Sequence, residues 1–373
     1  MGIEKKEHGF DSITGMRGIA CLFIMCFHYY CLYIDDPSLG NQAMPLYPYS
    51  EFFFLYSKNA VELFFMLSGF LTAYHYRKKI ASMNPWEYMK KHYGKLIIPS
   101  VIVTIWALAN AFLTLQYVPG SEEYVSQVTP LRVILSALMI NTGWFTSYKQ
   151  TQLPVNSTMW FVNVLLLCYI LYYVIRKLAR KNIVYLILCG LLVILGWICL
   201  DHSPKLPFLW AMDGRGYATF FLGALLCEFQ SEAGEKIRKR VSFGWGIVIA
   251  VLFAARLIIG FENIFGEVGS SLYVRYFEFF VAPGLILAVL NIEPLKKIFE
   301  LKPLIWLGVL SAPLYYLHNN IMEDYRILNC LTGNPVSFSS WYIMIAVLLS
   351  VIPFAMLWQF AGKRFSGKVV KPG

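Results

Sequence analysis

Ten stretches of mostly apolar residues, 15 to 22 residues long, constrain the fold of this chain more than any other feature of its sequence. A helix needs about 20 such residues to span the hydrocarbon core of a bilayer. We therefore predict an all-α fold, a polytopic membrane helix bundle of ten transmembrane helices that forms one domain over residues 1–373. The predicted spans are residues 13–34, 57–76, 96–117, 158–175, 183–200, 216–230, 243–261, 272–291, 303–323 and 341–361.

The composition agrees with a location in the bilayer. Only 14% of the residues are charged and 58% are hydrophobic, whereas soluble domains carry about 25% charged residues. Aromatic residues make up 17% of the chain, which suits rings placed at membrane interfaces. An eleventh apolar stretch, residues 131–145, is short and contains Arg132, so we interpret it as an interfacial or re-entrant helix.

The basic residues predict the orientation of the bundle. Cytoplasmic loops of membrane proteins carry an excess of Lys and Arg. With both termini in the cytoplasm, the loops and tails on the inside hold 23 of the 32 Lys and Arg residues, in segments 5–6, 77–95, 176–181, 236–240, 296–302 and 363–371. Counting 131–145 as a span would reverse every later loop. The net charge of +10 then reflects topology, and we expect no nucleic-acid partner.

Arg17 and His28 stand out in the first span. Eleven residues are close to three helical turns, so the two side chains share one helix face, about 16 Å apart along the axis. Ionisable groups inside a membrane usually face a cavity or a partner and mark a working site. His28 has the chemistry of a general base; the alternative is a structural histidine, which Arg17 on the same face makes less attractive. Arg17 either anchors the helix at the interface or binds an anionic ligand from the cytoplasm.

Other polar residues lie in or beside the apolar stretches. Glu62 opens the second span at a depth similar to that of His28, and we expect it to orient the imidazole as a third catalytic group; the alternative is an interfacial carboxylate. His318 lies near the outer end of the ninth span and is a second base or a substrate-binding residue, unless it is structural. Ser68, Trp160 and Asn163 are further substrate-binding candidates, although Ser68 also suits close helix packing and Trp160 an interfacial belt.

The loop after the second span is the densest basic patch. Arg77, Lys91 and Lys95 are candidates for binding a phosphorylated cofactor from the cytoplasm, although topology or anionic lipid also explains such charge. No P-loop or GxGxxG motif occurs, so the sequence does not suggest nucleotide hydrolysis. The eight cysteines form no CxxC pair, and we expect neither a disulfide framework nor a metal site.

Taken together, these segments resemble the acyltransferase-3 family of integral membrane O-acyltransferases. The resemblance rests on Arg17-x10-His28, on the block from Val61 to Leu71, on Trp160-Phe161, on residues 220–224 and on residues 307–318. It implies transfer of an acyl group, often acetyl, from a cytosolic thioester to a hydroxyl of a glycan or lipid-linked sugar, with roles for Arg17 and His28. Family members often carry an Arg-x-x-Arg pair after the second span, where this chain has His92 and Lys95.

We therefore predict a multi-pass O-acyltransferase of the cell membrane, in a bacterial cytoplasmic membrane, that uses acyl-CoA (acetyl-CoA) as co-substrate. Its expected partners are membrane lipid and a glycan or lipid-linked sugar acceptor. Arg17 would meet the phosphates of the donor, and His28, supported by Glu62, would deprotonate the acceptor. The rival hypotheses are a transporter or flippase of an acyl donor or lipid-linked sugar, and a structural or sensory subunit. The sequence leaves open the acceptor, the acyl chain, the oligomeric state and the choice between direct transfer and an acyl-enzyme.

Overall fold

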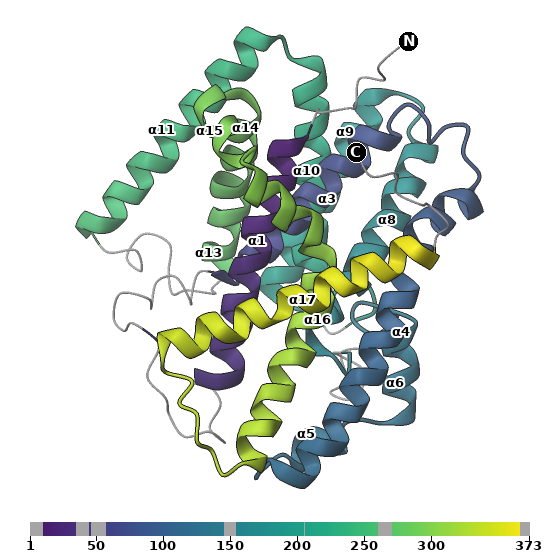
Figure 1. The fold of residues 1–373 in the computed structure, drawn as a ribbon. Coiled ribbons are helices and arrows are strands. Elements are labelled where there is room, and N and C mark those ends of the chain that lie inside the picture. The colour runs from purple at the N-terminus through teal and green to yellow at the C-terminus, as the bar shows by residue number, and fades with distance from the viewer. Residues whose placement is uncertain are drawn as a thin grey trace, which may run out of the picture.

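The computed structural model describes residues 10–34, 45, 57–144, 154–204, 206–259 and 271–365, and every element in these ranges is helical. The elements of the first half are α1 (Asp11–Tyr29), η1 (Tyr30–Ile34), α3 (Ala60–Tyr76), α4 (Pro85–Tyr117), α5 (Glu122–Ser126), α6 (Pro130–Ala137), η3 (Ser157–Met159) and α8 (Trp160–Leu178). Those of the second half are α9 (Asn182–His202), α10 (Ala211–Glu232), α11 (Glu235–Ile259), α13 (Ser271–Tyr276), η4 (Phe277–Val281), α14 (Ala282–Asn291), α15 (Glu293–Phe299), α16 (Lys302–Leu331) and α17 (Trp341–Phe365). The predicted helix bundle is confirmed (Figure 1).

A helix lies at each of the ten predicted spans, but not all of these helices meet the requirements of a span. Within the residues that the structure describes, six are long and apolar enough to cross a membrane, and the bent pair α15 and α16 would make a seventh. The shortfall includes α3, which has 17 residues. The structure therefore supports a multi-pass membrane protein, while the count of ten spans and the orientation of the termini stay predictions.

Helix α4 begins earlier in the chain than its apolar stretch predicts, and local sequence signals explain why. Helix α4 begins at Pro85, eleven residues before the predicted span, because the Asn84 side chain accepts a hydrogen bond from the backbone N–H of Trp86 and proline fits the first helical turn. The cytoplasmic candidates Lys91 and Lys95 are therefore helical rather than in a loop.

Residues 131–145, predicted to be interfacial or re-entrant, contain all of the short helix α6 except its first residue, Pro130. Its eight residues are too few to span a bilayer. Arg132 is only 4% exposed, and its guanidinium donates to the backbone carbonyls of Gln127 and Pro154. The structure thus agrees with the prediction that this segment does not cross the membrane.

Two close parallel helix pairs form the centre of the bundle. In the pair α1 and α16, the backbones nearly touch: a Cβ atom added to Gly18 would lie 2.8 Å from the Gly308 nitrogen, and one added to Gly308 would lie 1.8 Å from the Thr14 oxygen. In the pair α3 and α10, a Cβ on Gly69 would lie 1.9 Å from the Phe220 oxygen. Glycine permits this approach between membrane helices.

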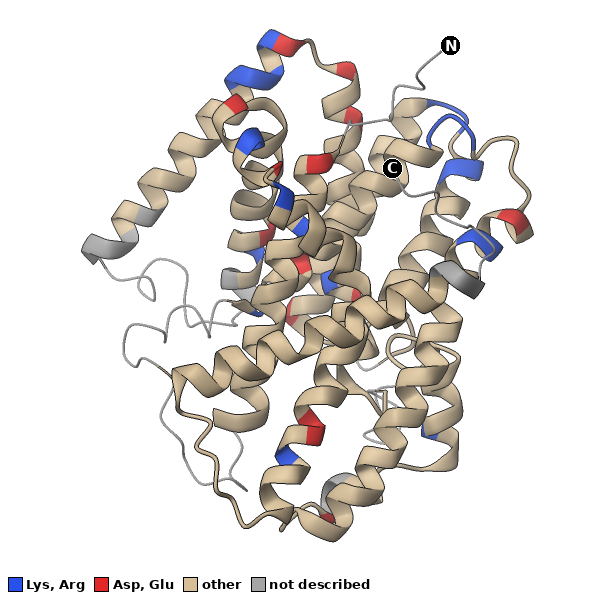
Figure 2. Ribbon diagram, in the orientation of Figure 1, with Lys and Arg blue, Asp and Glu red and all other residues tan. Residues whose placement is uncertain are grey.

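The relative directions of these helices match the predicted topology. Odd-numbered spans should run one way and even-numbered spans the other, and each parallel pair joins two spans of equal parity, the first with the ninth and the second with the sixth. Lys and Arg residues gather at one end of the bundle, at the top of Figure 2, and few lie at the opposite end. We refer to these as the basic end and the opposite end.

Candidate active site

Helix α1 is continuous from Asp11 to Tyr29, so Arg17 and His28 lie on one face of the same helix, as predicted. Helix α1 packs against α16 in a constant register: Gly18 meets Gly308, and the Cys21 thiol donates to the backbone carbonyl of Ser311 at 3.4 Å. Further along the same pair, at the same sequence separation of 290 residues, His28 meets His318. The close glycine contact therefore also determines which residue of α16 faces His28.

The two histidines form a hydrogen-bonded pair whose tautomers follow from the surrounding groups. His28 Nδ1 lies 2.8 Å from His318 Nε2. His318 Nδ1 lies 2.7 Å from the Tyr315 carbonyl oxygen and 3.1 Å from that of Leu314. A carbonyl only accepts, so His318 Nδ1 must carry the proton, and in the neutral ring Nε2 is then an acceptor. His28 Nδ1–H consequently donates, which leaves the lone pair on His28 Nε2.

The remaining nitrogen of His28 is available for chemistry. Nε2 makes no hydrogen bond to any residue that the structure describes, and it is not among the fully buried polar atoms. The His28 side chain is half-buried, whereas His318 is 0% exposed. Both nitrogens of His318 are engaged within the protein, so the geometry suits positioning His28 better than the predicted contact with substrate.

The chain changes its helical geometry immediately after His28. Residues Tyr30–Ile34 form a π-helical turn, and the Tyr33 hydroxyl donates to the backbone carbonyl of Met322 on α16. Such turns are rare and occur frequently at functional sites. Here the turn follows the residue that is best placed to act as a base.

Arg17 carries a charge that the described part of the protein leaves unpaired. The side chain is half-buried and forms no hydrogen bond or ion pair with a described residue. Its polar neighbours are the Tyr169 phenol and the Cys21 thiol. An unpaired guanidinium inside a membrane protein is costly, so this position favours an anionic ligand over a structural role.

Polar groups continue from Arg17 toward the basic end. The His92 ring contacts the Tyr169 ring at an interplanar angle of 35°, with 4.1 Å between ring centroids, and His92 Nε2 is buried without a hydrogen-bond partner among the described residues. Lys91 and Lys95 are exposed on the same turns of α4. Lys91 also pairs with Glu87 at 2.9 Å, a surface ion pair. His92, an electrostatic neighbour of Lys91 and Lys95, and Tyr169, a neighbour of Arg17, therefore connect the exposed lysines of α4 with Arg17 on α1 through side-chain contacts.

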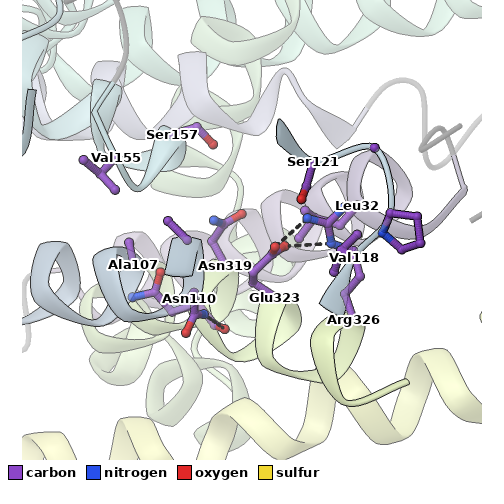
Figure 3. Close-up of a pocket in the computed structure, with 14 residues that line it drawn as sticks. Leu32, Ala107, Asn110, Val118, Ser121, Val155, Ser157, Asn319, Glu323 and Arg326 are labelled. Atoms are coloured by element: carbon purple, nitrogen blue, oxygen red, sulfur yellow. Dashed lines mark hydrogen bonds and ion pairs between the residues drawn. The ribbon is translucent and has the colours of Figure 1, made fainter. Parts of the chain in front are cut away.

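At the opposite end lies a pocket of about 320 Å³ (Figure 3); the described residues that line it include chain neighbours of both histidines but neither His28 nor His318 itself. Leu32, one turn after His28, and Asn319 and Asn320, which follow His318, line it. Glu323 and Arg326 form an ion pair at its wall, marked by the dashed lines in Figure 3.

The two asparagine side chains from α16 in this pocket differ in their hydrogen bonding. Asn320 is fixed, because its carbonyl accepts from Asn110 at 3.0 Å and its side-chain oxygen accepts from Asn156 at 3.2 Å. The half-buried side chain of Asn319 makes no hydrogen bond to a described residue. The pocket thus offers a free amide beside a rigid polar wall.

Comparison with protein families identifies the chain. A family model described as an acyltransferase domain matches residues 10–358, nearly the whole sequence. The chain belongs to this acyltransferase family. The predicted resemblance to the acyltransferase-3 family is confirmed, and the protein is a multi-pass membrane acyltransferase by family and fold. No curated protein and no solved structure matches the chain.

Glu62 does not contact His28 in this acyltransferase, and the expectation that it orients the imidazole is wrong. Its Oε1 accepts from Arg215 Nε at 2.5 Å, and the guanidinium lies 4.9 Å from the centre of the Trp160 ring. The parallel packing of α3 on α10 places Glu62 beside Arg215, whereas His28 faces α16. Similar depth in the membrane did not imply contact, because the two residues lie on faces turned to different helices.

Arg215 belongs to a larger group of charged side chains inside the helix bundle. Glu278, which is 0% exposed and lies in the π-helical segment η4, is an electrostatic neighbour of both Glu62 and Arg215. Trp197 donates to its Oε2 at 3.0 Å. Sequence reasoning missed Glu278, although a glutamate within an apolar span is itself a signal.

The remaining predicted residues fall in three places. Ser68 is a neighbour of the Tyr169 phenol, close to Arg17, and is not among the described residues that line the pocket with Asn319. Asn163 is 0% exposed, and both polar atoms of its side chain lack partners among the described residues. Arg77 pairs with Glu228 at 3.6 Å and Glu232 at 3.3 Å on α10, so its charge is largely compensated.

Proposed function

We propose that this acyltransferase moves an acyl group, in the simplest case acetyl, from cytosolic acyl-CoA to a hydroxyl of a cell-surface glycan or lipid-linked sugar. We place it in a bacterial cytoplasmic membrane, with the basic end in the cytoplasm. The observation that carries the proposal is the hydrogen-bond arrangement around His28, which leaves an unprotonated Nε2 on the same helix face as Arg17, whose charge no described residue pairs.

The donor would approach from the basic end. Its phosphates would meet Lys91 and Lys95 and then Arg17, because guanidinium and ammonium groups bind phosphate oxygens. The donor would also meet the Tyr169 phenol beside Arg17, and Tyr316, which is an electrostatic neighbour of Tyr169. The thioester end would extend along α1 toward His28.

The acceptor hydroxyl would occupy the pocket at the opposite end. Amides and a carboxylate–guanidinium pair suit the hydroxyls of a sugar, each of which both donates and accepts hydrogen bonds. Asn319 offers the free amide for this contact, and Asn320, Glu323 and Arg326 form the fixed wall. A lipid-linked acceptor would reach the pocket from the bilayer.

The transfer itself balances with His28 as the base. His28 Nε2 takes the proton of the acceptor hydroxyl while the oxygen attacks the thioester carbonyl carbon. The new C–O bond forms, the C–S bond breaks, and the imidazolium returns the proton to the leaving thiolate, which gives the free thiol of CoA. General-base assistance of this kind is typically worth about 10²–10⁴ in rate.

Purified protein in detergent, incubated with acetyl-labelled CoA and a glycan extract, tests the proposal. We expect label in the glycan for the native chain and for His202→Ala, a matched control at an exposed histidine. Folded His28→Ala should lose transfer. Normal transfer by His28→Ala would overturn the mechanism. No labelled glycan with the native chain in detergent, together with movement of the labelled donor across the membrane when the protein is placed in vesicles, would favour a transporter or flippase.

A further inference from the structure

A second pocket, at the basic end, has features that the proposed reaction does not use. It has a volume of about 340 Å³ and lies between the start of α1, the end of α3, the turn from α10 to α11, and α14 and α15. Among the described residues that line it, three are basic and none is acidic; the basic ones are Arg77, Arg238 and Lys296. Its remaining polar groups include the hydroxyls of Ser12 and Tyr74.

Two of the three cations lack a strong ion pair within the described part of the chain. Arg238 donates to the backbone carbonyls of Gln230 and Ala233 at the end of α10, and its Nε is buried without any partner there. Lys296 has its nearest carboxylate, that of Glu300, at 3.9 Å. By these bonds Arg238 stabilises the end of α10. That structural role does not explain why its Nε is buried without a hydrogen-bond partner, or why Lys296, on a separate helix, lines the same pocket.

The start of α1 forms one side of the pocket. Phe10 at the N-cap and Ser12 in the first turn both line it, and the first turn also carries the carboxylate of Asp11. Phe10 also forms an apolar wall with Tyr74 and Phe70, at ring-centroid distances of 4.4 Å and 6.0 Å. Hydrogen-bond donors thus face an apolar surface within one pocket.

We propose that this pocket binds a phosphate-bearing group that has an apolar or ring-shaped neighbour. Arginine and lysine are the usual ligands of phosphate, and basic pockets between membrane helices on the cytoplasmic side bind lipid headgroups. Two molecules supply this chemistry at the membrane surface: an anionic phospholipid, and the nucleotide part of the acyl donor. The proposal does not depend on acyl transfer, because binding is measured without turnover.

Binding measurements on the full-length protein test it. The probes are phosphatidylglycerol and phosphatidylcholine, measured by native mass spectrometry, and adenosine 3′,5′-bisphosphate, measured by calorimetry. The variants are Arg238→Gln and Lys296→Gln. The control is Lys236→Gln, which removes the same charge from an exposed position of α11.

We expect each pocket variant to lower the affinity for one of the two anionic probes by about tenfold or more relative to the control. This is the change that the loss of one charge-assisted hydrogen bond predicts. Weaker phosphatidylglycerol binding identifies a lipid site, and weaker nucleotide binding identifies a donor subsite. Lys296→Gln should leave the fold intact, because the Lys296 side chain is 40% exposed and lies in the short helix α15, which has no fully buried residue. A loss of binding in this variant is therefore not a sign of misfolding. If both anionic probes bind these variants as they bind the control, the proposal is wrong.

Discussion

Replacing His318 tests the geometry on which the mechanism depends, without touching the proposed base. His318→Met keeps a side chain of similar size but removes the acceptor for His28 Nδ1–H and the donor to the Tyr315 carbonyl. A buried hydrogen-bonding group left without its partner costs about 1–3 kcal/mol. If that cost falls on the orientation and tautomer of His28, transfer should slow by about 5- to 150-fold, because each 1.36 kcal/mol is a factor of ten in rate.

The matched variant is His318→Gln. Its side-chain amide oxygen can reach the position of the lost Nε2 and accept from His28 Nδ1–H at close to the native 2.8 Å. Most of the activity should then return, although the donor to the Tyr315 carbonyl is still missing. A purely structural histidine predicts a different pattern, in which both variants lower thermal stability and neither changes the turnover of the folded fraction.

The assay is acetyl transfer from labelled acetyl-CoA under single-turnover conditions, with the folded fraction measured by size-exclusion chromatography. Single-turnover rates separate the chemical step from binding. His318→Met with native turnover would refute the argument that His318 positions His28. His318→Gln as impaired as His318→Met would refute a hydrogen bond donated by His28 Nδ1 and accepted by His318 Nε2.

Three further predictions follow from contacts elsewhere. Arg17→Gln should raise the KM for the acyl donor by about tenfold in steady-state assays, the loss expected for one charge-assisted contact, and an unchanged KM would contradict a phosphate role. Glu62→Gln leaves Arg215 buried without its carboxylate, and breaking a buried pair in this way costs about 3–5 kcal/mol, so the melting temperature should fall clearly; an unchanged value would show that the pair is dispensable. Gly308→Ala places a methyl group 1.8 Å from the Thr14 carbonyl oxygen; overpacking costs about 1–3 kcal/mol, and equal stability by thermal unfolding would show that α1 and α16 separate easily.

The helices were accessible from the sequence because the apolar stretches encode them directly, and the family was accessible because its motif blocks, beginning with Arg17-x10-His28, are present in the chain. The start of α4 shows the limit: hydropathy places it at residue 96, and the capping side chain of Asn84 extends the helix to Pro85. Hydropathy identifies the part of a helix that is apolar enough to lie in lipid, but it does not identify the residue at which the helix begins.

The site was predictable where residues share one helix and not where they meet across helices. Arg17 and His28 lie on one face of α1 because eleven residues fix their angle. The pairing of Glu62 with Arg215, and of His28 with His318, depends on which helices are neighbours. Depth in the membrane could not decide this, whereas the glycines at 18, 69 and 308 carried a signal of close contact whose partner the sequence does not name.

The shared spacing in α1 and α16 restricts how the two helices can vary. Ten positions lead from Gly18 to His28, and ten lead from Gly308 to His318. Inserting a single residue in either interval would rotate its histidine by about 100° around the helix axis and turn the imidazole away from its neighbour. Insertions and deletions between glycine and histidine should therefore appear in both helices together or in neither, a pattern that an alignment of relatives can check.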